Sequence, residues 1–434
     1  MEASLRALFE FNQHYKRQIT EALNANKLSK LYIACQDGDV NTVRTLLPTI
    51  RYHQLNRFEC NGSTPLHIAT IRGHSEIVRL LLHDYCCQRH LRDNQGLTAY
   101  DQASNEEIRR LFYRPSNINR FNEDEEIISQ SEATGQNDAS NVLTKPDRIY
   151  LIGFEANEDI PHQLNGLNGI KAMFQSRLGR FIMETGMKLK LAKDTGYTDE
   201  EYAYVTSRKF REDALRKLID EHVTSNHREY QHCYYLFNEY IEHDTIESLL
   251  KLYTLETPFY KQLMILSSPL GFPFFMHLTD LKKRYFQGYT YRGLRVSEHK
   301  LNEYRWALKH PNSVLCIMTF SSTSIDRHVA EKFSSSRLKP SQTISTLLIY
   351  HFSQPCDTAI NLSGIPRYHL PCISNYENEK EVLIAPRTFF QVTDIQFNQS
   401  TNRCTIHLEN LCGEHQNVVQ ALTLLLKNDL KKKM

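Results

Sequence analysis

The sequence contains no apolar run of the about 18 residues that a membrane-spanning helix needs. It also contains no C-x-x-C pair, although ten cysteines are spread over its 434 residues. The absence of such pairs argues against a zinc knuckle or a redox dithiol, and buried free thiols in a reducing compartment are the simpler interpretation. The first ten residues mix apolar and charged side chains, so we expect no secretory signal and a cytoplasmic protein.

Net charge is also nearly absent, because 52 basic residues against 50 acidic residues leave only +2. This balance gives no global electrostatic reason to expect a nucleic-acid partner. No group of histidines and cysteines has metal-ligand spacing, so we expect no metal site. The contents of 41% apolar and 24% charged residues are those of a globular protein, and the length suffices for two or three domains.

A repeated pattern occupies residues 28–112. Its second copy reads T-P-L-H-I-A at residues 64–69, and Gly38 and Gly73 are placed to allow a turn between two helices. An alanine small enough for close helix packing recurs every 34 or 35 residues, at Ala34, Ala69 and Ala103. The pattern resembles the ankyrin repeat. The resemblance implies a stack of helix pairs that binds a protein partner or supports the neighbouring domain.

The remaining chain is divided by its composition. We predict a lead-in helix at 1–27, a flexible, polar and acidic linker at 113–148, and a C-terminal helix with a basic end at 413–434. Residues 149–412 form the second domain, with a short strand at 149, helical periodicity over 164–264 and period-two patterns after Gly271. The expected strands are 289–296, 314–320, 343–352, 381–385, 389–397 and 403–408, and the expected later helices are 297–309 and 326–333. The predicted fold class is therefore α+β after an N-terminal helical repeat.

Three short motifs in the strand-rich half carry groups suited to chemistry. The first is Y-R-G at 291–293, where an arginine fork and an adjacent open backbone suit a phosphate or a ribose. The second is F-S-S-T-S at 320–324, where hydroxyls end a strand and Ser324 is placed to cap a helix. The third is Y-E-N-E-K-E-V-L-I at 376–384, which predicts an extended strand with Glu379 and Glu381 on one face.

In this order the three motifs resemble the arginine–serine–glutamate branch of the mono-ADP-ribosyltransferases, over about residues 253–392. The resemblance implies a helical subregion followed by a mixed β-sandwich, with NAD as co-substrate. It implies that Arg292 holds the diphosphate or the nicotinamide ribose and that the Gly293 backbone bonds the nicotinamide amide. Ser322 would support the catalytic glutamate, Phe333 would stack on the nicotinamide ring, and Glu381 would bond the ribose 2′-hydroxyl as that glutamate.

The same resemblance assigns two residues to the acceptor. Glu379 would engage the acceptor, and a glutamate at this place goes with an arginine on a target protein. Tyr376 would be an aromatic residue of the substrate-recognition segment. Cleavage of the nicotinamide–ribose bond creates an oxocarbenium-like centre that a carboxylate stabilises, while a second carboxylate grips a guanidinium. Two alternatives stay open, an NAD glycohydrolase in which water replaces arginine, and a catalytically silent ankyrin-based binding protein.

Overall fold

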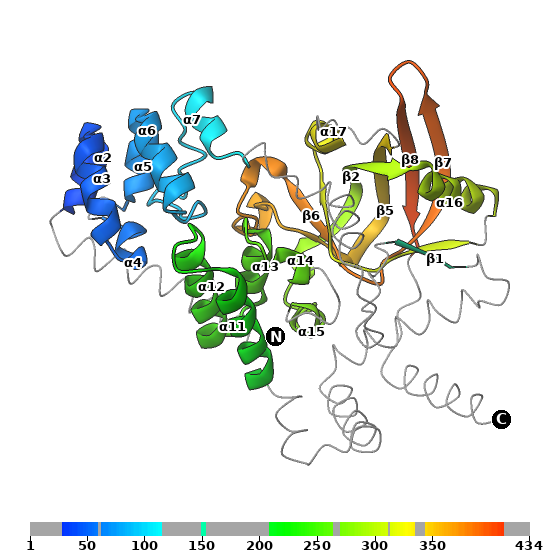
Figure 1. The fold of residues 1–434 in the computed structure, drawn as a ribbon, viewed down its shortest axis with the longest axis horizontal. Coiled ribbons are helices and arrows are strands. Elements are labelled where there is room, and N and C mark those ends of the chain that lie inside the picture. Colours follow the sequence, from blue (N-terminus) through cyan, green and yellow to red (C-terminus); the bar gives the residue numbers. More distant parts are fainter. Residues whose placement is uncertain are drawn as a thin grey trace, which may run out of the picture. The chain divides into compact units, whose positions relative to one another are not determined.

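The computed structural model describes residues 28–59, 62–114, 149–152, 208–263, 270–310, 313–334 and 343–411 (Figure 1). The expected lead-in helix, nearly all of the expected linker and the expected C-terminal helix lie outside these residues. The described chain divides into two compact units. The first contains 28–114, Arg211–Lys261 and Ser363–Asn378, and the second contains 149–152, 262–362 and 379–411.

The N-terminal part of the first unit consists of short helices joined by tight turns. They are α2 (Lys30–Asp37), α3 (Val40–Leu46), η1 (Leu47–Thr49), α4 (Tyr52–Leu55), α5 (Pro65–Arg72), α6 (Ser75–Arg79), η2 (Leu80–Asp84) and α7 (Glu106–Leu111). Gly38 and Gly73 have φ angles of 75° and 77°, so the absence of a Cβ permits both predicted turns. Ala34 and Ala69 are buried between the helices. The first two predicted helix pairs are confirmed, whereas the third copy forms the single helix α7 and Ala103 lies before it.

Four further helices follow in the chain: α11 (Arg208–His222), α12 (Tyr230–His243), α13 (Ile246–Thr254) and α14 (Tyr260–Leu263). The sequence places this segment in the C-terminal domain, whereas its contacts place Arg211–Lys261 in the first unit. The reason is aromatic packing. The ring of His232 stacks on that of Tyr52 with centroids 5.6 Å apart, and Tyr235 packs against the core of the repeats. This part of the predicted tyrosine stripe is thus core, as expected.

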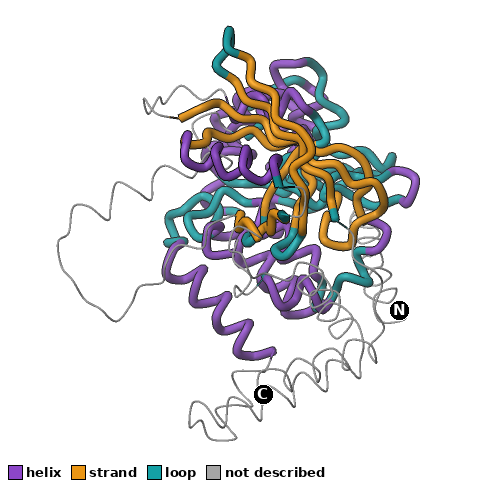
Figure 2. The backbone as a smooth tube through the Cα atoms, turned by 90° about the vertical axis from the view of Figure 1, so that its right-hand side faces the viewer, coloured by secondary structure: helices purple, strands orange, loops and turns teal. Residues whose placement is uncertain are grey.

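The second unit is built on one sheet of eight strands (Figure 2). They are β1 (Ile149–Ile152), β2 (Tyr285–Ser297), β3 (Val314–Ile317), β4 (Ser321–Ser324), β5 (Thr343–Asn361), β6 (Glu381–Ile384), β7 (Phe389–Asn398) and β8 (Arg403–Asn410). Their order is β1-β3-β7-β8-β5-β2-β4-β6, and β5 also pairs with β6. All the pairs are antiparallel except β5 with β8. Strands β2, β4 and β6 are therefore neighbours, which decides the geometry of the site.

Helices cover both faces of this sheet. Helix α16 (Glu298–Lys309) shares a core with Leu348 of β5, whereas α17 (Arg327–Ser334) packs against the adjacent Leu347. Since successive side chains of a strand point to opposite faces, the two helices lie on opposite sides of β5. Ser297 caps α16 through the backbone N–H of Lys300, as predicted. The short helices α15 (Gly271–Met276) and η3 (Lys282–Arg284) precede β2, and η4 (Pro366–Tyr368) and η5 (Glu377–Glu379) follow β5.

The predicted strands are all present, but several differ in extent: β2 begins at Tyr285 and not at 289, and β5 continues to Asn361 and not to 352. Residues 314–320 were expected as one strand, but the structure has β3 and then a separate strand β4 at Ser321–Ser324. The strand pattern expected over 376–384 is wrong for its first half. Residues Glu377–Glu379 form a 3-10 turn, and Lys380 has a φ of 45°, so the extended strand begins only at Glu381.

Candidate active site

The three motif residues Arg292, Ser322 and Glu381 lie on three adjacent strands, β2, β4 and β6. In the ladders, Tyr291 of β2 pairs with Ser324 of β4, and Ser324 pairs with Glu381 of β6. All three motif residues are buried, with exposed fractions of 6%, 2% and 1%. The motifs are far apart in the sequence, and the strand order places the strands that carry them side by side.

The guanidinium of Arg292 is fixed across two strands. Its Nη1 donates a hydrogen bond of 2.7 Å to the carbonyl oxygen of Ser322. Tyr350 lies near this cation on β5; burial raises the pKa of the Tyr350 hydroxyl to about 12, and the charge of Arg292 opposes that rise. A buried, permanently charged fork with a fixed orientation suits a diphosphate or a ribose oxygen.

The hydroxyls of β4 bind the strands on either side. Thr323 accepts a hydrogen bond of 2.7 Å from the Thr290 hydroxyl of β2 and donates one of 2.7 Å to the carbonyl of Val382 on β6. Ser324 donates to the carbonyl oxygen of Glu379 at 2.7 Å and accepts from the backbone N–H of Asp326 before α17. Ser324 therefore does not cap α17 as expected, because this helix begins at Arg327 and the Asp326 side chain accepts the hydrogen bond from the backbone N–H of His328, at 3.0 Å. The buried hydroxyls of Thr323 and Ser324 instead hold β4 and the residues around it in place.

The backbone at Glu379 has a different conformation from the predicted extended strand. The expected shared strand face does not apply to it, because Glu379 ends a 3-10 turn and the left-handed Lys380 separates it from β6. This conformation is held by backbone contacts: Ser324 binds the carbonyl of Glu379, and Ile325 donates to the carbonyl of Lys380 at 3.1 Å. The Glu379 side chain is buried, with 2% exposure.

Gly293 and Phe333 belong to the contact between β2 and α17. A Cβ added at Gly293 would lie 1.9 Å from the carbonyl oxygen of Ala330, so no side chain fits at this position. Phe333 is half-buried on the same helix. The glycine thus allows α17, and with it Phe333, to approach the strand that carries Arg292.

Tyr376 is not presented to an acceptor in this structure. Its exposed fraction is 2%, and its ring lies within the first unit between two guanidinium groups. The Cζ atoms of Arg114 and Arg89 lie 4.0 Å and 4.9 Å from the ring centroid. The role predicted for Tyr376 in reading the acceptor stays a prediction, and the environment of this residue could not be foreseen from the motif.

Glu377, the neighbour of Tyr376, gives the first unit a pH-dependent contact. Burial, followed by the charge of Asp101, raises the pKa of the Glu377 carboxyl from 4.5 to about 7, against the opposing effects of Arg92 and the Thr98 hydroxyl. Its Oε2 accepts from Thr98 at 3.3 Å, and its Oε1 is buried without a hydrogen-bond partner in the part of the chain that the structure describes. The protonated carboxyl is therefore the form that the folded unit favours.

Because the pKa of Glu377 is higher in the folded state, its protonated carboxyl stabilises the folded first unit. This stabilisation is complete below about pH 4.5 and is lost as the pH rises through about 7. We expect the first unit to lose about 2 kcal/mol of unfolding free energy between pH 5 and pH 8. Urea denaturation, followed by the helical circular-dichroism signal at each pH, measures this. Glu377→Gln mimics the protonated form and should flatten the pH dependence. Equal slopes in the two proteins would contradict the assignment.

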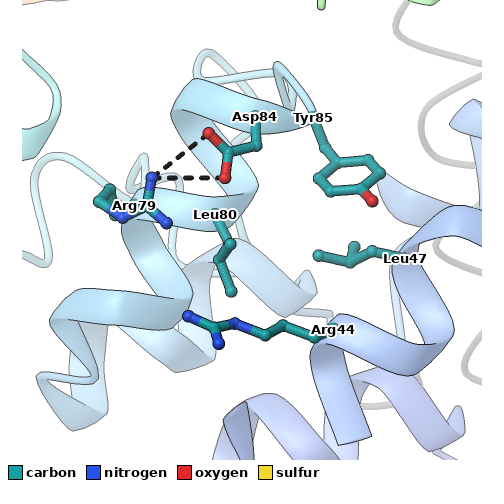
Figure 3. Close-up of a pocket in the computed structure, with 6 residues that line it drawn as sticks. All are labelled: Arg44, Leu47, Arg79, Leu80, Asp84 and Tyr85. Atoms are coloured by element: carbon teal, nitrogen blue, oxygen red, sulfur yellow. Dashed lines mark hydrogen bonds and ion pairs between the residues drawn. The ribbon is translucent and has the colours of Figure 1, made fainter. Parts of the chain in front are cut away.

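An open pocket lies on the ankyrin repeats, away from the motif residues in the sequence (Figure 3). Arg79 of its wall bonds both carboxylate oxygens of Asp84 at 3.3 Å, and Glu76 accepts hydrogen bonds from Arg79 and Arg44. Its lining residues are Arg44, Leu47, Arg79, Leu80, Asp84 and Tyr85. Both arginines of the lining thus have acidic partners, Asp84 in the wall and Glu76 outside it.

Within the described ranges, no helix is both long and apolar enough to cross a membrane. The same residues contain no group of three or more histidine, cysteine, aspartate or glutamate side chains that could hold a metal ion.

Comparison with known families identifies the N-terminal part. A model described as ankyrin repeats (3 copies) matches residues 4–93 and 31–122, so the chain carries ankyrin repeats. The human "Transient receptor potential cation channel subfamily A member 1" is 39% identical over 80 residues. That match covers 18% of this chain and only 7% of the channel, so the chain spans a small fraction of this curated relative.

Comparison with solved structures finds ADP-ribosyltransferases and a bacterial effector. Vis from Vibrio splendidus has 17% identity and a TM-score of 0.24 over 47% of this chain and 86% of its own. The ADP-ribosyltransferase HopU1 of Pseudomonas syringae has 12% identity and a TM-score of 0.31, and the match covers 47% of this chain and 98% of HopU1. The type III effector XopAI from Xanthomonas axonopodis has 15% identity and a TM-score of 0.32, and the match covers 54% of this chain and 100% of the XopAI chain. TM-scores this low establish neither a common activity nor a common site.

Proposed function

We propose that the chain is an NAD-dependent protein-arginine ADP-ribosyltransferase. The observation that supports the proposal is the adjacency of β2, β4 and β6, the three strands that carry Arg292, Ser322 and Glu381. The donor set suits NAD, with a buried guanidinium for the diphosphate or ribose and a hydroxyl and a carboxylate for the sugar. NADP is the related donor that the same groups could accept.

In the proposed reaction, the bond between nicotinamide and ribose C1′ breaks, and nicotinamide leaves with the bonding electron pair. Glu381 accepts a hydrogen bond from the ribose 2′-hydroxyl and stabilises the positive charge that develops on the sugar. A guanidinium nitrogen of the acceptor then forms the new bond to C1′. Glu379 holds that guanidinium and takes the proton that the nitrogen loses. Phe333 stacks on the departing nicotinamide ring.

The acceptor is a protein that presents an arginine, and the ankyrin repeats provide a surface for recruiting it. The proposal is tested by incubating the full chain with labelled NAD and agmatine, a simple guanidine. We expect labelled ADP-ribosylagmatine and an equal amount of nicotinamide. Nicotinamide release without labelled agmatine would instead identify an NAD glycohydrolase. Neither product, from a folded chain at several NAD concentrations, would overturn the proposal.

A further inference from the structure

The segment between β5 and β6 belongs to a different unit from the strands that it joins. Strand β5 ends at Asn361 and β6 begins at Glu381, both in the second unit. The intervening Ser363–Asn378 belongs to the first unit, together with the ankyrin repeats and Arg211–Lys261. Glu379 is the first residue after this segment. Contacts that hold the end of this segment therefore also hold the backbone that leads into Glu379.

The end of the segment is fixed through the ring of Tyr376. Arg114, which follows α7, has its guanidinium 4.0 Å from the ring centroid, and that of Arg89, which follows η2, is at 4.9 Å. All three side chains are buried. Cation–π contacts strengthen when water is excluded, so two of them on one ring form a strong attachment.

The two arginines are themselves held in place within the first unit. Arg114 forms an ion pair with Glu256, next to α13, and both side chains are almost fully buried. Arg89 donates a hydrogen bond of 2.7 Å to the carbonyl of Phe112. The cations therefore do not need to be ordered when they contact the ring, which lowers the entropic cost of the attachment.

Two further hydrogen bonds flank Tyr376. The backbone N–H of Asn375 donates to the Thr254 hydroxyl of α13 at 3.0 Å, and the Thr98 hydroxyl donates to Glu377 at 3.3 Å. The three consecutive residues 375–377 are thus bound to three separate parts of the first unit. Only Glu377 and Asn378 lie between Tyr376 and Glu379, and both belong to the 3-10 turn Glu377–Glu379.

We infer that Tyr376 is a positioning residue for the acceptor side of the reaction, held by Arg89 and Arg114 of the ankyrin-containing unit. The inference rests on the proposed function. This attachment to the first unit limits the positions that Glu379 can adopt. Because Glu379 acts on the acceptor in the proposed function, the attachment affects transfer to a guanidine more than cleavage of NAD. The ankyrin repeats are then part of the transferase and not only a recruiting module.

The test compares Tyr376→Leu, which removes the π face, with Tyr376→Phe, which keeps it and removes only the hydroxyl. We expect amide hydrogen exchange in residues 363–378 to be about tenfold faster in the leucine variant, and the ratio of agmatine transfer to NAD hydrolysis to fall about tenfold. The phenylalanine variant should keep both values within about twofold of the native protein. Exchange in β8 reports whether the rest of the molecule is intact.

The outcomes separate the inference from the proposed function. Unchanged exchange in the leucine variant overturns the attachment, and an equal fall of transfer and hydrolysis overturns the selective positioning. A loss of transfer in Tyr376→Phe overturns it as well, because the hydroxyl would then act on the acceptor. If the native protein cleaves no NAD, the proposed function fails, while the exchange data still decide the attachment. Should the leucine variant not fold, Arg89→Lys keeps the charge, loses the planar contact, and should increase exchange about threefold.

Discussion

Glu381→Gln is expected to lower both NAD hydrolysis and transfer to agmatine about a thousandfold. Glutamine keeps the size and the hydrogen-bonding reach of the side chain but removes the charge that opposes the developing positive centre on the ribose. That charge acts only in the transition state, so kcat should fall while the KM for NAD changes little. Nicotinamide release measured over a range of NAD concentrations separates the two constants.

The matched control is Glu298→Gln, the same chemical change on the exposed side of α16 in the same unit. Glu298 is exposed and forms an ion pair with the partly exposed Arg305, so this variant should keep native kinetics. Thermal unfolding of both variants checks that the buried substitution leaves the sheet folded. Retention of more than about a tenth of the native rate in folded Glu381→Gln would exclude Glu381 as the group that stabilises the sugar.

Glu379→Gln is expected to reduce transfer to agmatine about a hundredfold and to leave much of the NAD hydrolysis. The amide can still bond a guanidinium but cannot take its proton, and it lacks the charge for an ion pair. The substitution leaves the local backbone supported, because Ser324 binds the carbonyl oxygen of residue 379 and not its side chain. Both products are measured in one reaction with labelled NAD.

The ratio of the two products decides the role of Glu379. A parallel loss of hydrolysis would mean that Glu379 acts on the sugar, and unchanged transfer would remove it from the acceptor side. Glu381→Gln is the internal comparison, because it should abolish both products together. The two glutamates are separated by a single residue, Lys380, so the pair of variants tests whether neighbouring carboxylates divide the two halves of the reaction.

Much of the fold could be predicted from periodicity because its elements have one buried face. The alternation over 389–397 predicted β7, and the T-P-L-H-I-A motif predicted helix α5, which the structure shows to be capped by Thr64. Strand β4 was not predicted as a separate strand. It consists only of serine and threonine, and all four residues are buried. The Thr323 and Ser324 hydroxyls form hydrogen bonds with neighbouring strands and loops. An apolar pattern cannot indicate a strand of this kind.

The site was predictable to the extent that it depends on local motifs. The motifs predicted Arg292, Ser322 and Glu381 as candidate site residues, and the structure shows that they lie on adjacent strands. The conformation predicted for Glu379 was wrong, because a left-handed residue at Lys380 is uncommon and nothing nearby in the sequence requires it. The burial of Tyr376 depends on Arg89 and Arg114, which are more than 250 residues away in the chain, so no local pattern could predict it.

The first unit is assembled from three separate stretches of sequence, and its last stretch ends at Asn378. During synthesis, the ankyrin repeats leave the ribosome long before the ring that Arg89 and Arg114 enclose has been made. A fragment cut after Arg114 would expose these two cations and would leave the place of Glu256 and Tyr376 unfilled. The repeats of this chain therefore do not form a self-contained module that can be removed from one protein and joined to another.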